Sequence, residues 1–197
     1  MPAEAARTLV TPPVLPRGTL AARPQPEIPA GHLLLRPWRP ADAPAFFSAY
    51  EDAMLRRWHT NRPASPDQVD RWFVRYAEDW TAERGGHWAV TRDGDEVLGR
   101  MSLRRLDFDD GIGVAAYWTL PAARGQGVAS AALRALSAWA LDEIGFHRLE
   151  LDHSTRNPSS CRVAAKAGFA LEGTKRAAAL HEDGHHDMHL HARIRGD

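Results

Sequence analysis

Cysteine is almost absent from this 197-residue chain, which contains only Cys161. A single cysteine excludes an internal disulfide and any metal site made of several cysteines. It is typical of a reducing compartment, so we expect a cytoplasmic protein. The sequence also lacks an apolar run of the ~18 residues that a transmembrane helix requires. Its first residues contain no continuous apolar segment of the kind found in a secretory signal, so we expect no membrane partner.

A net charge is lacking as well, because 25 basic residues balance 25 acidic residues. Nothing in this balance favours binding to nucleic acid or to an anionic membrane, and we expect neither. Apolar residues make up 44% of the chain and charged residues 25%, which is ordinary for a globular domain.

The N-terminal segment is the part of the chain that is poorest in secondary-structure formers. Prolines stand at positions 2, 12, 13, 16, 24, 26 and 29. Proline fixes φ and removes a backbone donor, so neither a helix nor a central strand is expected there. We predict a mobile tail over residues 1–31, mostly extended or disordered, and one domain over residues 32–197. The tail is either a linker without a role or an arm lying over the domain or a dimer partner.

Hydrophobic periodicity and turn residues predict an α+β protein with a mixed sheet. Strands are expected over residues 32–36, 87–92, 97–106, 114–120, 148–154, 169–172 and 187–194, and helices over residues 40–52, 65–84, 128–144 and 158–167. Asp93-Gly94 is a hairpin signal, so the strands between residues 87 and 120 should form an antiparallel meander. The strand–helix–strand crossover between residues 114 and 154 should make its two strands parallel. One face of the helix 65–84 is apolar and is expected in the core: Val69, Trp72, Phe73, Tyr76 and Trp80.

The turn Arg124-Gly125-Gln126-Gly127-Val128-Ala129 joins a buried strand to the helix 128–144. Glycines permit close approach and unusual dihedrals, and a helix N-terminus offers unpaired N–H groups and a partial positive charge. No acidic residue lies between Leu120 and Leu141. These features predict a phosphate or pyrophosphate site. A Walker loop is absent, and Ser130 stands where a dinucleotide fingerprint requires its third glycine.

Arg124-x-x-Gly127-x-Ala129 resembles the acetyl-CoA pyrophosphate loop of the GCN5-related N-acetyltransferases (GNAT). The segment from Asn157 to Phe169 and the motif Leu35-Arg36-Pro37-Trp38 resemble the ribosomal-protein N-terminal (RimJ/RimL-type) group of that superfamily. The similarity spans about residues 33–194. It implies the GNAT fold, a mixed and mostly antiparallel sheet with helices on both faces and a parallel pair of strands splayed around acetyl-CoA.

The resemblance also implies residue roles. The pyrophosphate would lie on backbone N–H groups of Arg124, Gly125, Gln126, Gly127, Val128, Ala129 and Ser130. The pantetheine arm would follow Thr119 and Leu120 like an added strand and bond to Asn157, with Ser160 near the thioester sulfur.

The sequence departs from the superfamily at two catalytic positions. Ala164 stands where many members place a Tyr as general acid, and Val114 stands where many have a Glu acting as base through water. Ser160 is our first alternative acid and Tyr117 the second, although Ser160 could equally be a helix cap. His153 is the best-placed base, with His59 and His87 as rivals, but positioning alone can supply much of the rate. A backbone N–H near Leu120 is the expected oxyanion donor.

Histidines at 181, 185, 186, 189 and 191 suggest a metal site, but side chains at i and i+2 of a strand are too far apart without further ligands. We expect a solvated or pocket-lining face and no metal. The resemblance implies an acetyl-CoA-dependent N-acetyltransferase acting on a primary amine, and it favours a protein or peptide N-terminal α-amine. Small-molecule amines (an antibiotic, polyamine or metabolite) and a non-catalytic acyl-CoA-binding module are the alternatives. Residues 58–61 should help to form the acceptor pocket, and either a monomer or a homodimer is compatible with the sequence.

Overall fold

The computed structural model describes residues 11–197, and every structural statement below concerns that part of the chain. One eight-stranded sheet runs through the domain in the order β1-β2-β3-β4-β5-β6-β8-β7. The strands are β1 (Ile28–Ala30), β2 (Leu33–Pro37), β3 (Gly85–Arg92), β4 (Glu96–Asp107), β5 (Ile112–Thr119), β6 (Arg148–Ser154), β7 (Ala170–His181) and β8 (Gly184–Ile194). The helices are α1 (Ala43–Ala49), α2 (Ala53–Trp58), α3 (Pro66–Thr81), α4 (Val128–Ala138) and α5 (Pro158–Lys166), with short turns η1 (Pro40–Asp42), η2 (Pro121–Ala123) and η3 (Trp139–Ile144).

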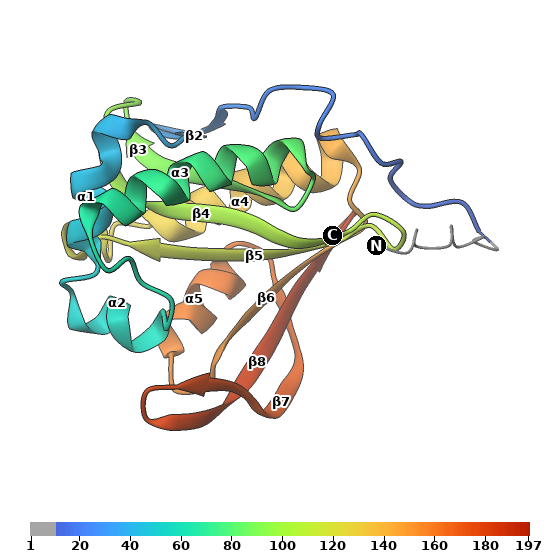
Figure 1. Cartoon of the computed structure of the whole chain (residues 1–197). Coiled ribbons are helices and arrows are strands. Elements are labelled where there is room, and N and C mark those ends of the chain that lie inside the picture. Colours follow the sequence, from blue (N-terminus) through green and yellow to red (C-terminus); the bar gives the residue numbers. More distant parts are fainter. Residues whose placement is uncertain (1–10) are drawn as a thin grey trace, which may run out of the picture.

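The central topology confirms the predicted α+β arrangement. Strands β3, β4 and β5 form the expected antiparallel meander, and β5 pairs in parallel with β6. The helix expected over residues 128–144 is α4 followed by the π-helical turn η3, and it ends at Gly145, whose φ of 102° is left-handed. Figure 1 shows β5 and β6 lying together at one end and then separating, with α5 beside the gap.

Two elements differ from the prediction. The helix expected over residues 40–52 ends at Ala49, and a separate helix, α2, begins after Asp52, whose side chain caps it by accepting from the Leu55 N–H at 2.8 Å. The short strands expected at residues 169–172 and 187–194 are the ends of a long antiparallel hairpin, β7 and β8. Both differences arise in stretches with weak apolar periodicity, where capping and strand pairing decide the structure.

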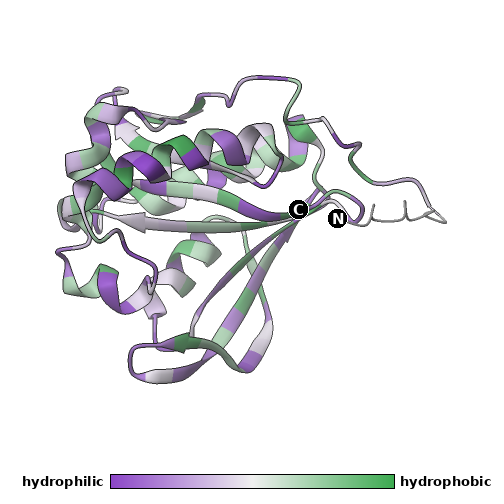
Figure 2. Ribbon diagram, viewed as in Figure 1, coloured by the Kyte–Doolittle hydropathy of each residue, from purple (hydrophilic) through white to green (hydrophobic). Residues whose placement is uncertain are grey.

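Neighbouring side chains on β5 point to opposite faces of the sheet, because successive residues of a strand alternate. Tyr117 packs against the larger apolar cluster, which includes residues of α4, whereas Trp118 belongs to a second cluster with residues of α1 and α3. Helices therefore cover both faces. The apolar stripe of α3 is part of this core, with Val69, Tyr76 and Trp80 buried, and Figure 2 shows apolar and polar bands alternating along that helix.

The N-terminal segment is more tightly bound to the domain than the prediction of a mobile tail allows. Residues 1–10 lie outside the described part, but Leu15 and Leu20 are buried in the main cluster. The Glu83 carboxylate accepts N–H groups of Gly18 at 2.7 Å and Leu20 at 2.8 Å. Strand β1 then pairs with β2. The described residues of this segment thus form an arm that lies over the domain. The arm adds buried side chains to the main core and one strand to the sheet.

Within residues 11–197, no helix combines the length and the apolar character that crossing a bilayer requires.

Candidate active site

The gap between β5 and β6 creates the site. The two strands pair only from Ile112 to Val114 on β5 and from Arg148 to Glu150 on β6. Beyond this point, β5 remains paired with β4 on its other side. The edge of β5 that faces the gap therefore has backbone groups that β6 does not engage. A first cavity of about 280 Å³ opens here, between β5, α2, α4 and α5.

The loop before α4 borders the first cavity with its backbone. Gly125 and Gly127 have φ angles of 77° and 79°, which favour glycine. No atom lies within 4 Å of a Cβ placed on Gly125, and only the Ser130 hydroxyl, at 4.0 Å, approaches one on Gly127. Ala131 donates to the Gly127 carbonyl at 3.0 Å, so the preceding amides of the first turn of α4 have no intrahelical acceptor. This end of the helix has the form of an anion site.

Arg124 connects this loop to α2. Its guanidinium forms an ion pair with Asp52 at 2.5 Å. The hydrogen bond from Arg124 contributes most to lowering the pKa of the Asp52 carboxyl below its ordinary value. The Arg124 N–H donates to the Pro121 carbonyl at 3.2 Å. That amide is therefore already used, and Arg124 contributes to the cavity through its side chain rather than through the N–H group that we expected.

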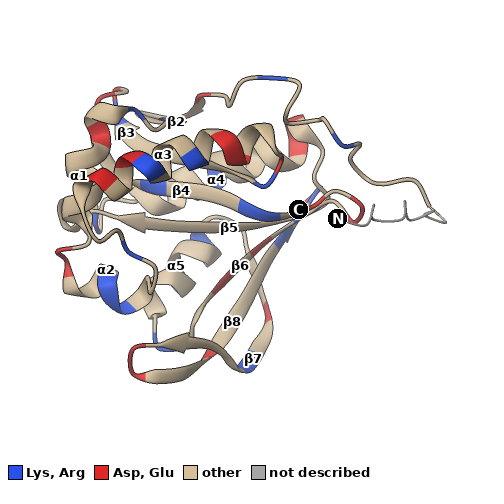
Figure 3. Cartoon of the chain, viewed as in Figure 1, with Lys and Arg blue, Asp and Glu red and all other residues tan. Residues whose placement is uncertain are grey.

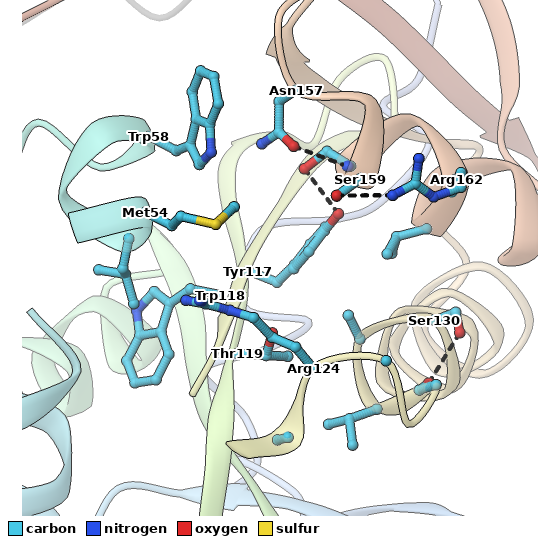
Figure 4. A pocket seen from close by; sticks show the side chains of 18 of the residues that line it. Met54, Trp58, Tyr117, Trp118, Thr119, Arg124, Ser130, Asn157, Ser159 and Arg162 are labelled. Atoms are coloured by element: carbon cyan, nitrogen blue, oxygen red, sulfur yellow. Dashed lines mark hydrogen bonds between the residues drawn. The ribbon is translucent and has the colours of Figure 1, made fainter. Parts of the chain in front are cut away.

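Tyr117 and Ser160 meet across the gap. Asn157 caps α5 by accepting from the Ser160 N–H at 3.2 Å, so Asn157, and not Ser160, is the cap. The Ser160 hydroxyl instead accepts from the Tyr117 phenol at 3.1 Å. Burial raises the pKa of Tyr117 to about 12, although the bond to Ser160 opposes that shift. Figure 4 shows Tyr117 extending from β5 towards the start of α5, below Asn157. Ala164 is fully buried in the core, at the position of the usual tyrosine.

A second cavity of about 450 Å³ lies on the side of the α3 helix. Six residues line both cavities: Trp58, His59, Tyr117, Trp118, Asn157 and Ser160. The two cavities therefore meet at the Tyr117–Ser160 pair. An acyl donor in the first cavity and an acceptor in the second would have their reacting atoms at this junction.

Two of the predicted bases line the second cavity as neutral rings. Burial, and then the charges of Arg100 and Arg104, lowers the pKa of His59 to about 4. Burial and the same arginines lower the pKa of His87 to about 2, and this effect outweighs the Asp79 carboxylate at 3.6 Å. His59 borders both cavities and His87 only the second, so His59 is closer to the junction.

The second cavity is basic. Arg75, Arg100 and Arg104 line it together with the acidic side chains of Asp79 and Asp152. Figure 3 shows the basic residues of β4 beneath α3. The Nε atom of Arg100 is buried and has no hydrogen-bond partner within residues 11–197. Burial, and then Arg105 and Arg100, lowers the pKa of Arg104. This cavity is suited to an acceptor that offers carbonyl or carboxylate oxygens.

Most of the residues predicted for the donor site lie around the first cavity. Leu120 and Gln126 do not line it. The Leu120 N–H donates to the Leu98 carbonyl at 2.9 Å, so it is not available as the expected oxyanion donor. The Gln126 side chain bonds to the Ala122 carbonyl at 2.6 Å. His153 lines only the second cavity, and burial lowers its pKa.

Sequence reasoning missed several lining residues of the first cavity, among them Met54, Leu55, Arg162 and Lys166. The first two belong to α2, a helix that the sequence did not predict. Arg162 and Lys166 are four residues apart on α5, so they share one face of that helix. The predicted helix and this spacing could have identified them.

Comparison with known proteins is consistent with this geometry. A family model described as "Acetyltransferase (GNAT) domain" matches residues 32–170. A ribosomal-protein-serine acetyltransferase of Escherichia coli (strain K12) is 33% identical over 100 residues, which are 51% of this chain and 56% of that protein. The match thus spans only about half of that relative. A putative ribosomal N-acetyltransferase of Bacillus subtilis (strain 168), YdaF, is 27% identical over 166 residues, 80% of this chain and 88% of that protein.

Solved structures have the same fold. RimL, a ribosomal alpha-N-protein acetyltransferase in complex with coenzyme A, superposes with a TM-score of 0.79 at 22% identity, covering 86% of this chain and 98% of that one. Mycobacterium smegmatis RimJ, in complex with a CoA-disulfide, gives 0.77 at 23% identity and covers 86% of each chain.

Proposed function

Because the chain belongs to the GNAT family of acetyltransferases, we propose that it transfers the acetyl group of acetyl-CoA to the α-amine of a protein or peptide N-terminus. Acetyl-CoA is the co-substrate of the family. The acceptor and the roles of individual residues are the proposal. One observation carries the choice of acceptor: a basic second cavity with neutral histidines meets the first cavity at Tyr117 and Ser160.

The residues around the first cavity fit acetyl-CoA. The glycine loop and the first amides of α4 suit the pyrophosphate, since nothing blocks the approach at Gly125. Lys166 and Arg162 add positive charge on the α5 side. Asn157 uses its oxygen to cap α5, which leaves its amide N–H groups to donate to a carbonyl of the pantetheine arm. The gap-facing edge of β5 offers strand-like backbone bonds to the same arm.

The Tyr117–Ser160 pair suits the departing thiolate. The acceptor nitrogen attacks the thioester carbon, and the C–S bond of the tetrahedral intermediate then breaks. The leaving sulfur requires one proton. Ser160 can donate its hydroxyl proton to the sulfur and regain one from the Tyr117 phenol, which already donates to it. The proton that the acceptor nitrogen loses finally returns to the phenol and restores the pair. With a pKa of about 12, Tyr117 holds this proton across the physiological range. The pair therefore replaces the tyrosine absent at Ala164.

The acceptor amine must be neutral to attack. With a pKa of about 8, roughly a tenth of an α-amine is neutral at pH 7, whereas a lysine side chain near 10.4 is neutral in fewer than about one molecule in a thousand. His59 has a low pKa and is a weak base. A site without a strong base is suited to the α-amine, with His59 receiving the proton lost by the nitrogen, through water.

The charge of the second cavity supports the same acceptor class. A polyamine carries several ammonium groups, and the arginines that line this cavity would repel them. A peptide N-terminus has one amine followed by carbonyl oxygens, which Arg100 can bind. The cytoplasmic location and the monomeric or homodimeric state stay predictions.

The test measures thiol release from acetyl-CoA with three acceptors. These are a lysine-free peptide with N-terminal Ser or Ala, an N-terminally blocked peptide with one internal lysine, and spermidine. We expect turnover with the first only, and mass spectrometry should place the acetyl group on the α-amine. Preferred turnover of spermidine or another small amine would overturn the proposed acceptor and leave the acetyltransferase assignment in place.

A further inference from the structure

Three histidines and the only cysteine of the chain gather outside the proposed reaction centre. The side chains of His153, Cys161, His189 and His191 each offer one ligand atom, and these four atoms lie within 4.8 Å of one another. We refer to these residues as the His3Cys cluster. They come from three elements, β6, α5 and β8.

Strand pairing explains how the cluster forms. His153 on β6 is directly opposite His189 on β8, and Leu151 is opposite His191. Residues two apart on a strand share a face, so the three imidazoles project together. The ring centroids of His153 and His191 are 5.1 Å apart, and those of His153 and His189 are 5.4 Å apart. From the sequence, histidines at i and i+2 of one strand could not form a metal site without further ligands. The structure supplies two candidates, His153 from β6 and Cys161 from α5.

Each histidine of the cluster has one buried ring nitrogen without a partner among the described residues. His153 and His191 are 7% and 2% exposed. Within residues 11–197, no hydrogen-bond partner reaches Nε2 of either ring, nor the buried Nδ1 of His189. A buried polar atom without a partner destabilises the fold, because it has lost its hydrogen bonds to water. Three such atoms on the rings of one cluster, together with a thiol, indicate a ligand that can satisfy all of them.

Contacts with backbone carbonyls favour, in two of the rings, the tautomer that a metal requires. The Nδ1–H of His153 donates to the Ser154 carbonyl at 2.9 Å, and that of His191 faces the Phe169 carbonyl at 3.5 Å. With the proton on Nδ1, the lone pair is on the unpartnered Nε2 and is available to a metal. Histidine ligands of metals usually have this carbonyl contact on the second nitrogen.

We propose that the His3Cys cluster binds one zinc ion as a structural site. Imidazole and thiolate donors in a tetrahedral arrangement are characteristic of zinc, whereas magnesium and calcium require oxygen ligands. Zn–N and Zn–S distances of about 2.0 and 2.3 Å place the ligand atoms roughly 3.3–3.7 Å apart, so the cluster must contract by about 1 Å. Binding releases the Cys161 thiol proton and leaves four protein ligands, with no open position for substrate.

The proposed ion would fasten α5 to the two strands on its side of the gap. Cys161 directly follows Ser160, which accepts from Tyr117. Zinc would therefore hold the start of α5, and with it Ser160 and Asn157, in place at the junction of the cavities. As a zinc ligand, His153 could not serve as the general base.

The test uses the untagged full chain, since a polyhistidine tag would bind the metal itself. After exposure to zinc and removal of excess metal, elemental analysis should give one zinc per chain, and zinc should raise the melting temperature. Cobalt(II) should give the visible spectrum of a tetrahedral site with a thiolate charge-transfer band, and Cys161→Ser should remove that band. His189→Gln should weaken zinc binding by at least about 100-fold, beyond the cost of changing an outer-shell partner.

His185→Gln is the matched control, because His185 is on the same strand but is exposed and outside the cluster. It should bind zinc like the parent chain. His189→Gln should unfold cooperatively at the melting temperature of the metal-free parent, which shows that the variant folds. No zinc uptake by the parent chain, or equal uptake by His189→Gln, would overturn the proposal. Neither result depends on acetyl transfer, so the proposed function is tested separately.

Discussion

The phenol of Tyr117 on β5 donates a 3.1 Å hydrogen bond to the hydroxyl of Ser160 on α5, across the gap where β5 and β6 diverge. The two residues are 43 positions apart in the sequence. They stand where the two cavities meet. A proton relay of two hydroxyls can therefore act at this point without the tyrosine that is absent at Ala164.

Loss of either hydroxyl should slow the chemical step. We expect Ser160→Ala and Tyr117→Phe each to lower kcat by about 100-fold, within the range of general acid catalysis, while the KM for acetyl-CoA changes little. Because the two groups act as one unit, the double variant should be scarcely slower than either single variant. Steady-state thiol release measures all three.

Ser159→Ala is the control for this pair, since Ser159 lines the first cavity and its hydroxyl accepts from Arg162 at 3.0 Å. It should retain near-parental kcat. Multiplicative losses in the double variant would contradict a shared relay.

The pH profile should follow the acceptor and not a histidine. His59 has a pKa of about 4 and is neutral above it, and Tyr117 is protonated up to about 12. Between these values, the group that titrates is the acceptor amine, whose protonated form is inactive. We expect kcat/KM to rise with pH up to the amine pKa, near 8 for an α-amine, and then to level off.

Two peptides whose N-terminal amines differ in pKa provide the check. The midpoint should move with the amine. A midpoint near 6.5 that is the same for both peptides would instead indicate a histidine with an ordinary pKa.

Arg100 should affect the acceptor and not acetyl-CoA. Its buried Nε has no partner within the described residues and belongs to the lining of the second cavity only. We expect Arg100→Met to raise the KM for a peptide acceptor by about tenfold or more, since a hydrogen bond to a charged group contributes ~1.5–3 kcal/mol. The KM for acetyl-CoA should stay unchanged. The exposed neighbour Arg105, changed to Met, should leave both constants near the parental values.

How far the sequence predicts this site depends on the kind of signal. Gly127 belongs to a glycine turn before one helix, and Asn157 is the cap of another. Both are local sequence patterns, so the positions of these residues could be predicted from the sequence alone. Met54 and Leu55 belong to α2, which is six residues long and depends on the Asp52 cap. Apolar periodicity cannot detect so short a helix.

The His3Cys cluster shows a second limit of the sequence. His189 and His191 are visible as neighbours on one strand. The opposition of His153 and His189 depends on the register of β6 with β8, which is set by the whole hairpin. Cys161 joins them only because α5 packs on that face. Such a site requires long-range pairing, which no local pattern records.

A negative charge introduced at position 127 should weaken the binding of acetyl-CoA. Gly127 caps α4 with a φ of 79°. Asp and Asn both tolerate this conformation and both cap helices well, so either replacement should fold normally. A carboxylate about 4 Å from the pyrophosphate repels it by ~1–4 kcal/mol. We therefore expect Gly127→Asp to bind acetyl-CoA at least about tenfold more weakly than Gly127→Asn by calorimetry. Equal affinities would place the pyrophosphate elsewhere.

The contribution of Glu83 to the stability of the fold, through its bonds to the N-terminal arm, should depend on pH. Burial alone would raise the pKa of this carboxyl, but the N–H donors of Gly18, Leu20 and Ala21 together lower it below its ordinary value of 4.5. A lowered folded-state pKa means that the ionised group stabilises the fold above about pH 4.5. That contribution is lost as the pH falls through the folded-state pKa.

Glu83→Gln removes the charge and keeps the shape, so it isolates this effect. We expect the variant to lose about 1.5–3 kcal/mol of unfolding free energy at pH 7, the range for hydrogen bonds to a charged group. The difference from the parent should shrink below pH 4.5, because the parent carboxylate then becomes protonated too. Urea unfolding at pH 7 and pH 3.5 measures both quantities. Glu78→Gln, an exposed position on α3, should change neither. A deficit that is equal at the two pH values would show that the ionised carboxylate does not hold the arm.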